Sequence, residues 1–380
     1  MYGYCFFDEF VLFYAVYALL FTDTGLGVWQ ISSLFVLWSA AGIVLEVPSG
    51  VLADVVSRRL LLIIGPLLTA LGFVLWTVTP SYWAFAAGFL LWGVQGAFQS
   101  GALEALVYEE LDRLGAADRY ARIMGRARAA GTVAVVLAML AAAPVFTAGG
   151  YPAIGLASVL ACLASAACAA ALPEHRGPRA ERDRGYAATL RAGLAEVRGD
   201  RRLLGALLLV PAVTAVWGAL DEYTPLLIQE TGVAAATVPL LLPVIWAGVT
   251  VGGLLGGVGE RATTRRLAAL LGVAGLALAA GAALGHPAGV GLVAVAFCAF
   301  QVSTVAADAR LQARIAGSSR ATVTSLAGLG TDLAGVGTYL AYAAVAAPAG
   351  HGATFVVFAA PYLVLALTLM IKASFTSAVV

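Results

Sequence analysis

The sequence predicts an all-α integral membrane protein with twelve transmembrane helices in two pseudo-symmetric six-helix halves. Its composition, the length of its apolar segments and the placement of its basic residues predict this fold. Of its 380 residues, 61% are hydrophobic and 11% are charged, whereas an average soluble domain is about 25% charged. Too few polar side chains remain to cover a soluble surface. This excludes soluble enzymes, nucleic-acid-binding proteins and disordered proteins.

Twelve apolar segments, called spans in chain order, are long enough to cross a membrane as helices, which takes about 20 residues. They lie at 3–21, 29–53, 60–78, 82–106, 129–147, 151–172, 203–229, 236–258, 266–285, 288–308, 321–346 and 353–373. None shows the alternation of a barrel strand. Their many Gly and Ala residues favour close helix contact in lipid.

All 22 basic residues lie in even-numbered connections, at the span ends that border them, or at the end of the last span. Positive residues stay on the cytoplasmic side, so we expect both termini in the cytoplasm and a multi-pass location in the cell (inner or plasma) membrane. The first span begins at Met1 without a basic segment, which argues against a cleavable signal peptide and leaves room for a longer native N-terminus. The basic residues follow the second span (Arg58, Arg59), the fourth (Arg113, Arg119, Arg122, Arg126, Arg128), the sixth (Arg176, Arg179, Arg182, Arg184, Arg191, Arg198, Arg201, Arg202), the eighth (Arg261, Arg265, Arg266), the tenth (Arg310, Arg314, Arg320) and the twelfth (Lys372).

The most polar connection, residues 173–202, separates an N-terminal half over 1–172 from a C-terminal half over 203–380. Its apolar residues at helical spacing fit a short amphipathic helix on the inner leaflet, and a plain solvated linker explains the composition equally well. The halves repeat short motifs at equivalent places. Ala97-Phe98-Gln99 recurs at 299–301, and Asp23-Thr24-Gly25 recurs as Glu230-Thr231-Gly232. A two-fold repeat is the architecture of alternating access.

The loop after the second span reads Gly50-Val51-Leu52-Ala53-Asp54-Val55-Val56-Ser57-Arg58-Arg59. It resembles the signature loop between helices 2 and 3 of the major facilitator superfamily, with Ser57 in place of the usual second Gly. Segments 46–49 and 100–109 are similar to members of that superfamily, and the second-half counterpart at 252–257 is degenerate. The resemblance implies the fold, secondary transport and a gating role for Gly50, Asp54, Arg58 and Arg59.

The residue types of this loop suit a latch. Gly50 lets helices approach closely, and Asp54 can accept from the free N–H groups of a helix N-terminus. Arg58 and Arg59 can pair with the acids at the end of the fourth span, which are Glu109, Glu110 and Asp112. Such contacts hold one face shut and break when it opens. The alternative is that both arginines only anchor the topology.

Eight acids lie within the spans, where the only two bases, Arg266 and Lys372, are at span ends: Asp8, Glu9, Glu46, Glu104, Asp221, Glu222, Asp308 and Asp332. A buried charge is costly, so intramembrane acids are functional candidates. A carboxyl loaded with a proton on one side and emptied on the other couples transport to the proton gradient and attracts cations. The resemblance implies that helices 1, 4, 7 and 10 line the cavity. This expectation and the depth of each acid in the membrane favour Glu9, Glu104, Asp221, Glu222 and Asp332. The alternative for Glu46, Glu104 and Asp308 is static pairing with Arg126, Arg128 or Arg310.

Aromatic and amide side chains are dense in the same spans. They suggest a mostly apolar cavity with a few polar groups, which suits amphiphilic or aromatic solutes and disfavours anions. Any single ring can instead face lipid. The candidate lining residues are Tyr14, Tyr17, Trp92, Gln95, Gln99, Trp217, Tyr223 and Gln301.

The leading hypothesis is a multidrug-efflux-like secondary transporter that exports a small hydrophobic or cationic solute by alternating access, coupled to proton entry. Two features depart from that subfamily. Trp92 stands where proton-coupled members often carry Arg, and span 5 lacks a Gly-Pro motif.

Two alternatives remain open. One is a nutrient symporter or uniporter of the same superfamily, and the other is an integral-membrane enzyme or sensor. The three histidines lie far apart, which argues against an enzyme, and the four cysteines lack metal-ligand spacing. We therefore expect no enzyme activity, no cofactor, no metal and no nucleic-acid partner. The expected partners are a small-molecule substrate, protons and the lipid bilayer, with the protein itself a monomer.

Overall fold

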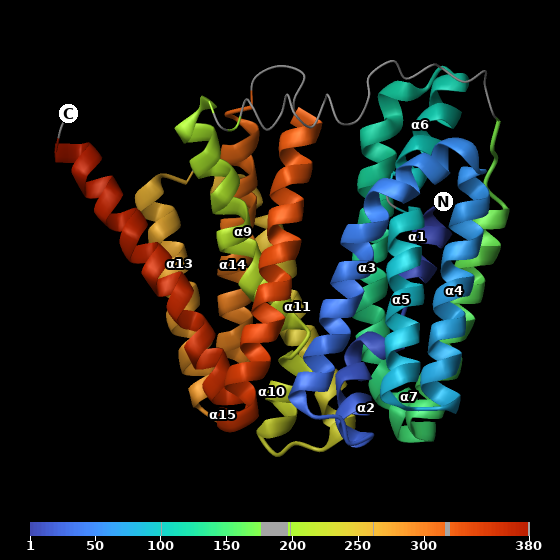
Figure 1. Ribbon diagram of the computed structural model, residues 1–380, viewed down its shortest axis with the longest axis horizontal. Helices are drawn as coiled ribbons and strands as arrows, with labels where there is room; N and C mark the ends of the chain where they lie inside the picture. Colours follow the sequence, from blue (N-terminus) through green and yellow to red (C-terminus); the bar gives the residue numbers. More distant parts are fainter. Residues whose placement is uncertain (100, 176–196, 198, 261, 316–319, 379–380) are drawn as a thin grey trace. The chain divides into compact units, whose positions relative to one another are not determined.

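The computed structural model describes residues 1–99, 101–175, 197, 199–260, 262–315 and 320–378, without the side chains of 46–55, 258, 260, 320–321 and 375–378. Within these ranges all regular secondary structure is helical. The chain forms two compact units (Figure 1). The first comprises Met1–Pro178 with Ala234–Leu240, and the second comprises Arg179–Val233 with Leu241–Val380. Of the amphipathic helix expected in the second part of 173–202, Leu190 and Leu194 lie outside the described residues, and Val197 is helical and buried.

The helices of the first unit run alongside one another (Figure 1). In α7 the backbone leaves the helical conformation at Gly149 and Gly150, the latter with φ +59°, so this element comprises spans 5 and 6. The elements are α1 (Tyr2–Glu9), η1 (Leu12–Ala15), α2 (Tyr17–Asp23), α3 (Val28–Val55), α4 (Arg58–Val78), α5 (Tyr82–Gln99), α6 (Ala102–Arg113), η2 (Ala117–Arg119) and α7 (Tyr120–Ala170).

The rest of the chain repeats this pattern. The last element, α15, is divided at Gly350, where φ is +81°, and so comprises spans 11 and 12. The elements are α9 (Arg201–Asp221), α10 (Thr224–Glu230), η3 (Ala235–Thr237), α11 (Val238–Leu254), α12 (Gly256–Glu260), α13 (Thr264–Ala283), α14 (Gly289–Gln312) and α15 (Arg320–Ala378).

Twelve transmembrane helices account for the described chain, as predicted. Within the described ranges, nine helices are long and apolar enough to cross a membrane, and two of these, Ala117–Ala170 and Thr322–Ser374, each contain two spans. The twelfth is α5, whose 18 residues include two glutamines.

Three of the twelve spans are broken. Span 1 loses regular α-helix between Glu9 and Tyr17, and span 4 breaks before α6, where Gly101 has φ +73°. Span 7 breaks between Asp221 and Thr224. Pro225 lies in the first turn of the helix after that break, because it lacks the N–H that an uninterrupted helix needs. Broken helices are typical of transporter binding regions, where they line a cavity or are covered by protein.

The repeated acid-Thr-Gly motifs have the same structural role in both units. Each acid ends a short helix, α2 or α10, and the glycine that follows has φ +90° or +84°. The Tyr151 hydroxyl, just after the α7 break, donates to Asp23 at 2.6 Å. The N–H of Gly352, just after the α15 break, donates to Glu230 at 2.5 Å. Each acid thus ties the first span of its half to the sixth.

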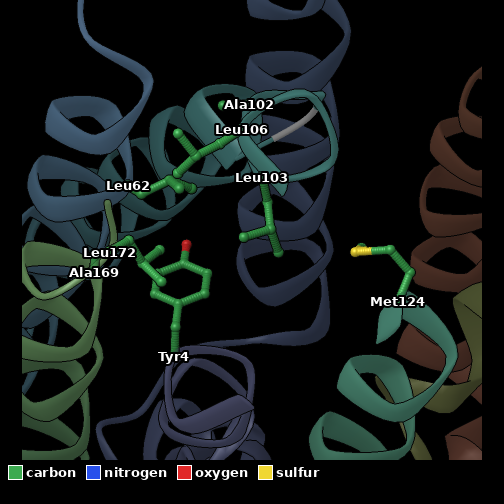
Figure 2. Packing of buried hydrophobic residues seen from close by; sticks show 8 residues of the cluster. All are labelled: Tyr4, Leu62, Ala102, Leu103, Leu106, Met124, Ala169 and Leu172. Atoms are coloured by element: carbon green, nitrogen blue, oxygen red, sulfur yellow. The ribbon is translucent and has the colours of Figure 1, made fainter. Parts of the chain in front are cut away.

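A buried cluster in the first unit packs α1 against α4, α6 and α7. Figure 2 shows the Tyr4 ring beside Ala169 and Leu172, with Leu62 and Leu106 nearby. Tyr4 is fully buried, so the cluster fixes the start of span 1. The position of the acids that follow it, Asp8 and Glu9, depends on this packing.

Candidate functional site

A polar network inside the first unit centres on Asp8, in the last turn of α1. Gln95 Nε2 donates to Asp8 Oδ1 at 2.7 Å, and Gln99 Nε2 donates to Oδ2 at 2.9 Å. The two glutamines are four residues apart and so share one face of α5. Ser165 of α7 donates to Oδ1 at 3.4 Å, and the Thr69 hydroxyl of α4 donates to Gln95 Oε1. The Asp8 carboxylate therefore links α1 directly to α5 and α7, and to α4 through Gln95.

The network satisfies groups that would be costly to bury alone. Gln95 and Thr69 are 6% and 2% exposed, and Asp8 is partly exposed. A carboxylate accepts on both oxygens, and both are occupied by neutral donors. The structure thus brings together Gln95 and Gln99, which the sequence singled out as lining residues, around an acid that the sequence placed inside the membrane but ranked below its neighbour.

That neighbour, Glu9, has a different environment. The Tyr14 hydroxyl lies 3.5 Å from Glu9 Oε2, a long contact for a hydrogen bond. The Tyr14 ring stacks on Trp92, with centroids 5.4 Å apart and planes at 25°. Span 5 passes close by, because a Cβ at Gly131 would lie 3.2 Å from Glu9 Cγ. Glu9 thus lies near the hydroxyl of a tyrosine that stacks on Trp92, while Tyr17 is buried among the rings of the unit's core.

In the second unit, Trp217 is held by an opened turn of α9. The Tyr362 hydroxyl donates to the Val213 carbonyl at 3.1 Å and accepts from the Trp217 N–H at 2.7 Å. These two backbone groups are four residues apart and would pair in a regular helix, so the hydroxyl is inserted into the helical ladder. The Trp217 ring N–H donates to Thr304 at 3.3 Å, and its ring lies near Phe297.

The break in span 7 places Asp221 and Glu222 beside Tyr223. Both acids are partly exposed, and within the described chain no side chain or backbone N–H donates to either carboxyl. Tyr223 is fully buried and stacks on Tyr342 with centroids 3.6 Å apart. The Tyr342 hydroxyl is 2.8 Å from Nδ1 of His351, which directly follows the α15 break.

The remaining candidates of the C-terminal half, Asp332 and Gln301, lie on α15 and α14. Asp332 is exposed on α15. Gln301 lies on α14, where a Cβ at Gly252 would come within 2.8 Å of its Cβ. Trp217 contacts α14, the helix of Gln301, whereas Tyr223 stacks on a tyrosine of α15.

The predicted gating loop contacts the ends of spans 4 and 6. Arg58 forms an ion pair with Glu109, and the Arg59 guanidinium donates to the Leu172 carbonyl at 3.3 Å. Gly50 and Asp54 lie in α3, in the part whose side chains are outside the described set. The expected pairing of Arg58 with an acid at the end of span 4 is present among the described residues.

Sequence reasoning missed Glu174. Its carboxylate accepts from the Arg58 N–H at 2.8 Å and from the Ser57 hydroxyl, so it sits at the N-terminus of α4. Ser57 is the N-cap of that helix, accepting from Leu60 N–H at 3.0 Å. The signal was present: replacing Gly with Ser in the loop supplies a capping side chain, and an acid directly after a span can reach a helix N-terminus.

Glu104 and Glu110, two further acids of the first unit, differ in how strongly their carboxylates are paired. Glu104, in the first turn of α6, lies 3.9 Å from Arg128, and both side chains are well exposed, so this pair contributes little. Glu110, beyond span 4, accepts from the His175 N–H at 2.7 Å and from Arg113 at 3.1 Å. Burial opposes its ionisation, but the His175 and Arg113 hydrogen bonds outweigh burial and lower the Glu110 pKa.

Comparisons with known proteins agree with this architecture. The profile of the Major Facilitator Superfamily matches residues 1–339. Similar solved structures include the nucleoside transporter NupG (13% identity, 97% of each chain, TM-score 0.78). A bacterial homolog of the human lysosomal transporter Spinster, inward-facing and occupied, is 17% identical over 99% of this chain and 95% of that one, with TM-score 0.73. An auto-inhibited peptide transporter of the POT family is 14% identical over 98% and 96%, with TM-score 0.72.

No curated protein sequence gives a significant match. The structural likenesses, at this identity, establish the fold, and the profile match covers most of the chain. The chain belongs to the major facilitator superfamily and is a multi-pass membrane transporter rather than an enzyme.

Proposed function

We propose that this protein exports a small hydrophobic or cationic solute in exchange for protons, by alternating access. The observation that carries the proposal is the setting of its intramembrane acids. Glu9 lies near the hydroxyl of Tyr14, whose ring stacks on Trp92, Asp8 accepts from neutral donors, and the described surroundings of both lack a basic side chain.

Carboxylates beside aromatic faces attract cations. The ring faces carry negative potential and gain further attraction for a cation when water is excluded. An anion would need an arginine or lysine partner, and the basic residues of this chain lie in the connections between spans. A hydrophobic cation therefore fits these surroundings better than a phosphate or carboxylate would.

Proton exchange supplies the driving force in this proposal. A membrane acid that releases its proton on one side and takes one up on the other transfers one charge per cycle. The proposed candidates for proton or substrate binding are Asp8, Glu9 and Glu104 in the first half and Asp221, Glu222 and Asp332 in the second. The aromatic and amide residues around them would provide the apolar lining.

Gating is proposed for the loop that contains Gly50, Asp54, Arg58 and Arg59. The contacts of Arg58 with Glu109 and of Glu174 with the start of α4 support a latch at the basic end of the first half. The one-sided distribution of basic residues supports cytoplasmic termini in the cell membrane. The proposed unit of function is a monomer.

A second candidate is a nutrient symporter or uniporter. Structural likeness to proteins described as a nucleoside transporter and a peptide transporter favours it. The two candidates differ in direction and in the chemistry of the solute, so one vesicle assay separates them.

The test uses purified protein in liposomes with an imposed pH gradient. Tetraphenylphosphonium, a hydrophobic cation, is compared with tetraphenylborate, an anion of the same shape, and with uridine and a dipeptide. We expect gradient-driven accumulation of the cation alone, abolished by a protonophore. Accumulation of uridine or the dipeptide would favour the second candidate, and cation accumulation that survives the protonophore would overturn proton coupling.

A further inference from the structure

We propose that Asp8, rather than the adjacent Glu9, is the carboxylate that exchanges the proton, and that Thr69 positions Gln95, one of its hydrogen-bond partners. This inference rests on the proposed proton coupling and names the residue responsible for it. Its basis is the network of Asp8, Gln95, Gln99, Ser165 and Thr69.

Protonation of Asp8 changes its contacts with other helices. The ionised carboxylate only accepts, and it takes one amide on each oxygen. When one oxygen binds a proton it becomes a donor, so the amide N–H facing it has to withdraw or turn. A single proton on Asp8 therefore alters the contact between α1 and α5. Glu9 contacts the hydroxyl of Tyr14, which follows it closely in the same broken span.

The two glutamines are not equivalent. The Thr69 hydroxyl donates to Gln95 Oε1, which keeps Gln95 Nε2 directed at Asp8 Oδ1. Among the described residues Gln99 Oε1 has no donor of this kind, so its amide can turn and accept. We assign the added proton to Oδ2, where it is donated to Gln99 Oε1. Thr69 and Gln95 then act as positioning residues that favour the ionised state.

Every titratable group around Asp8 belongs to the same unit. Glu9, Tyr4 and Cys5 lie on its own helix, Cys162 faces it from α7, and Glu104 of α6 acts on Tyr4 and Cys5. The groups facing it from α4 and α5 are uncharged. The N-terminal ammonium interacts electrostatically with Cys5 on the same helix, and no arginine or lysine of the described residues contacts Asp8, so the amides, Ser165 and Glu9 are the groups that act on it directly.

The first test is infrared difference spectroscopy of the purified protein in lipid, titrated with pH without any substrate. Isotope-labelled glutamine identifies the amide carbonyl change that accompanies protonation of Asp8. We expect Asp8→Asn to remove the carboxyl component that titrates together with this amide change, and the matched variant Glu9→Gln to retain it. Loss of the component in Glu9→Gln, or its survival in Asp8→Asn, would overturn the assignment.

The second test addresses positioning and stands even if Asp8→Asn fails to fold. Thr69→Val removes the hydroxyl that fixes Gln95, while Thr69→Ser keeps it. We expect the midpoint of the coupled carboxyl and amide change to move to higher pH by about one unit in Thr69→Val, since a charge-assisted hydrogen bond is weakened, and to stay in place in Thr69→Ser. Equal midpoints in the two variants would overturn the positioning role.

The infrared titration and the liposome assay separate this inference from the proposed function. The infrared titration needs no transport, whereas the liposome assay needs no knowledge of which acid titrates. Failure of cation transport with an intact Asp8 component would therefore reject the function alone. Normal proton-driven transport in Asp8→Asn would reject the inference alone.

Discussion

Removing one buried hydroxyl in the second unit tests how Trp217 is held. Tyr362 is fully buried, and its hydroxyl bridges the Val213 carbonyl and the Trp217 N–H at 3.1 and 2.7 Å. The variant Tyr362→Phe deletes both hydrogen bonds and leaves the ring in place. The ring can keep its contact with Phe300, whose centroid is 4.1 Å away.

The expected loss follows from two hydrogen bonds. Each contributes about 0.5–1.5 kcal/mol net, so we expect about 2 kcal/mol of destabilisation. The destabilisation is smaller if the opened turn of α9 closes, because the Val213 carbonyl and the Trp217 N–H can then pair directly. That closure would move the indole of Trp217 away from Thr304. At about 2–4 °C per kcal/mol for a unit of this size, the melting temperature falls by roughly 4–8 °C.

The assay is thermal unfolding in detergent, followed by tryptophan fluorescence. The matched control is Tyr108→Phe, which deletes the same atom from a ring that is 50% exposed. Equal melting temperatures for the two variants, with unchanged Trp217 fluorescence, would refute the bridging role of the Tyr362 hydroxyl.

Two further predictions concern the first unit. Glu110 has a lowered pKa, so its contacts stabilise the protein above the usual glutamate value of 4.5 and are lost as the pH falls through the lowered value. The stability difference between wild type and Glu110→Gln should therefore shrink as a denaturation series is taken below pH 4.5, and a constant difference would contradict this. A Cβ at Gly155 would lie 1.9 Å from Thr77 Oγ1, so Gly155→Ala should destabilise the unit by about 1–3 kcal/mol. Gly125→Ala, in the part of α7 before its break and with nothing within 4 Å of its Cβ, should not, and similar melting temperatures for both would contradict the close packing.

The twelve spans and the break at Pro225 could be predicted because they depend on local properties. Apolar length decides whether a helix crosses the membrane, and proline lacks the N–H that a continuous helix requires. The acid-Thr-Gly repeat likewise marked equivalent positions in the two halves, where each acid meets the start of the sixth span of its half.

The break in span 1 had no local signal. Residues Phe10 to Val16 include neither Gly nor Pro, and the opened backbone depends on a distant partner, because Ser158 of span 6 accepts from the Phe13 N–H at 3.2 Å. Tertiary contacts of this kind are invisible in a hydropathy pattern.

The ranking of Asp8 and Glu9 depended on the same missing information. Adjacent helical residues point in directions about 100° apart, so only the position of α5 decides which acid meets the glutamines. Glu174 was missed for a related reason. Its partner is the start of α4, more than one hundred residues earlier in the chain.

The central claim, exchange of a hydrophobic cation for protons, is tested most directly by proton movement. Liposomes containing the protein and a trapped pH-sensitive dye start without a pH gradient, with the membrane potential clamped by valinomycin and equal potassium. An inward gradient of tetraphenylphosphonium should make the lumen alkaline, because each entering cation releases protons outward, and protein-free or Asp8→Asn liposomes should show no such change. Entry of the cation through the wild-type protein at constant lumenal pH would contradict the account.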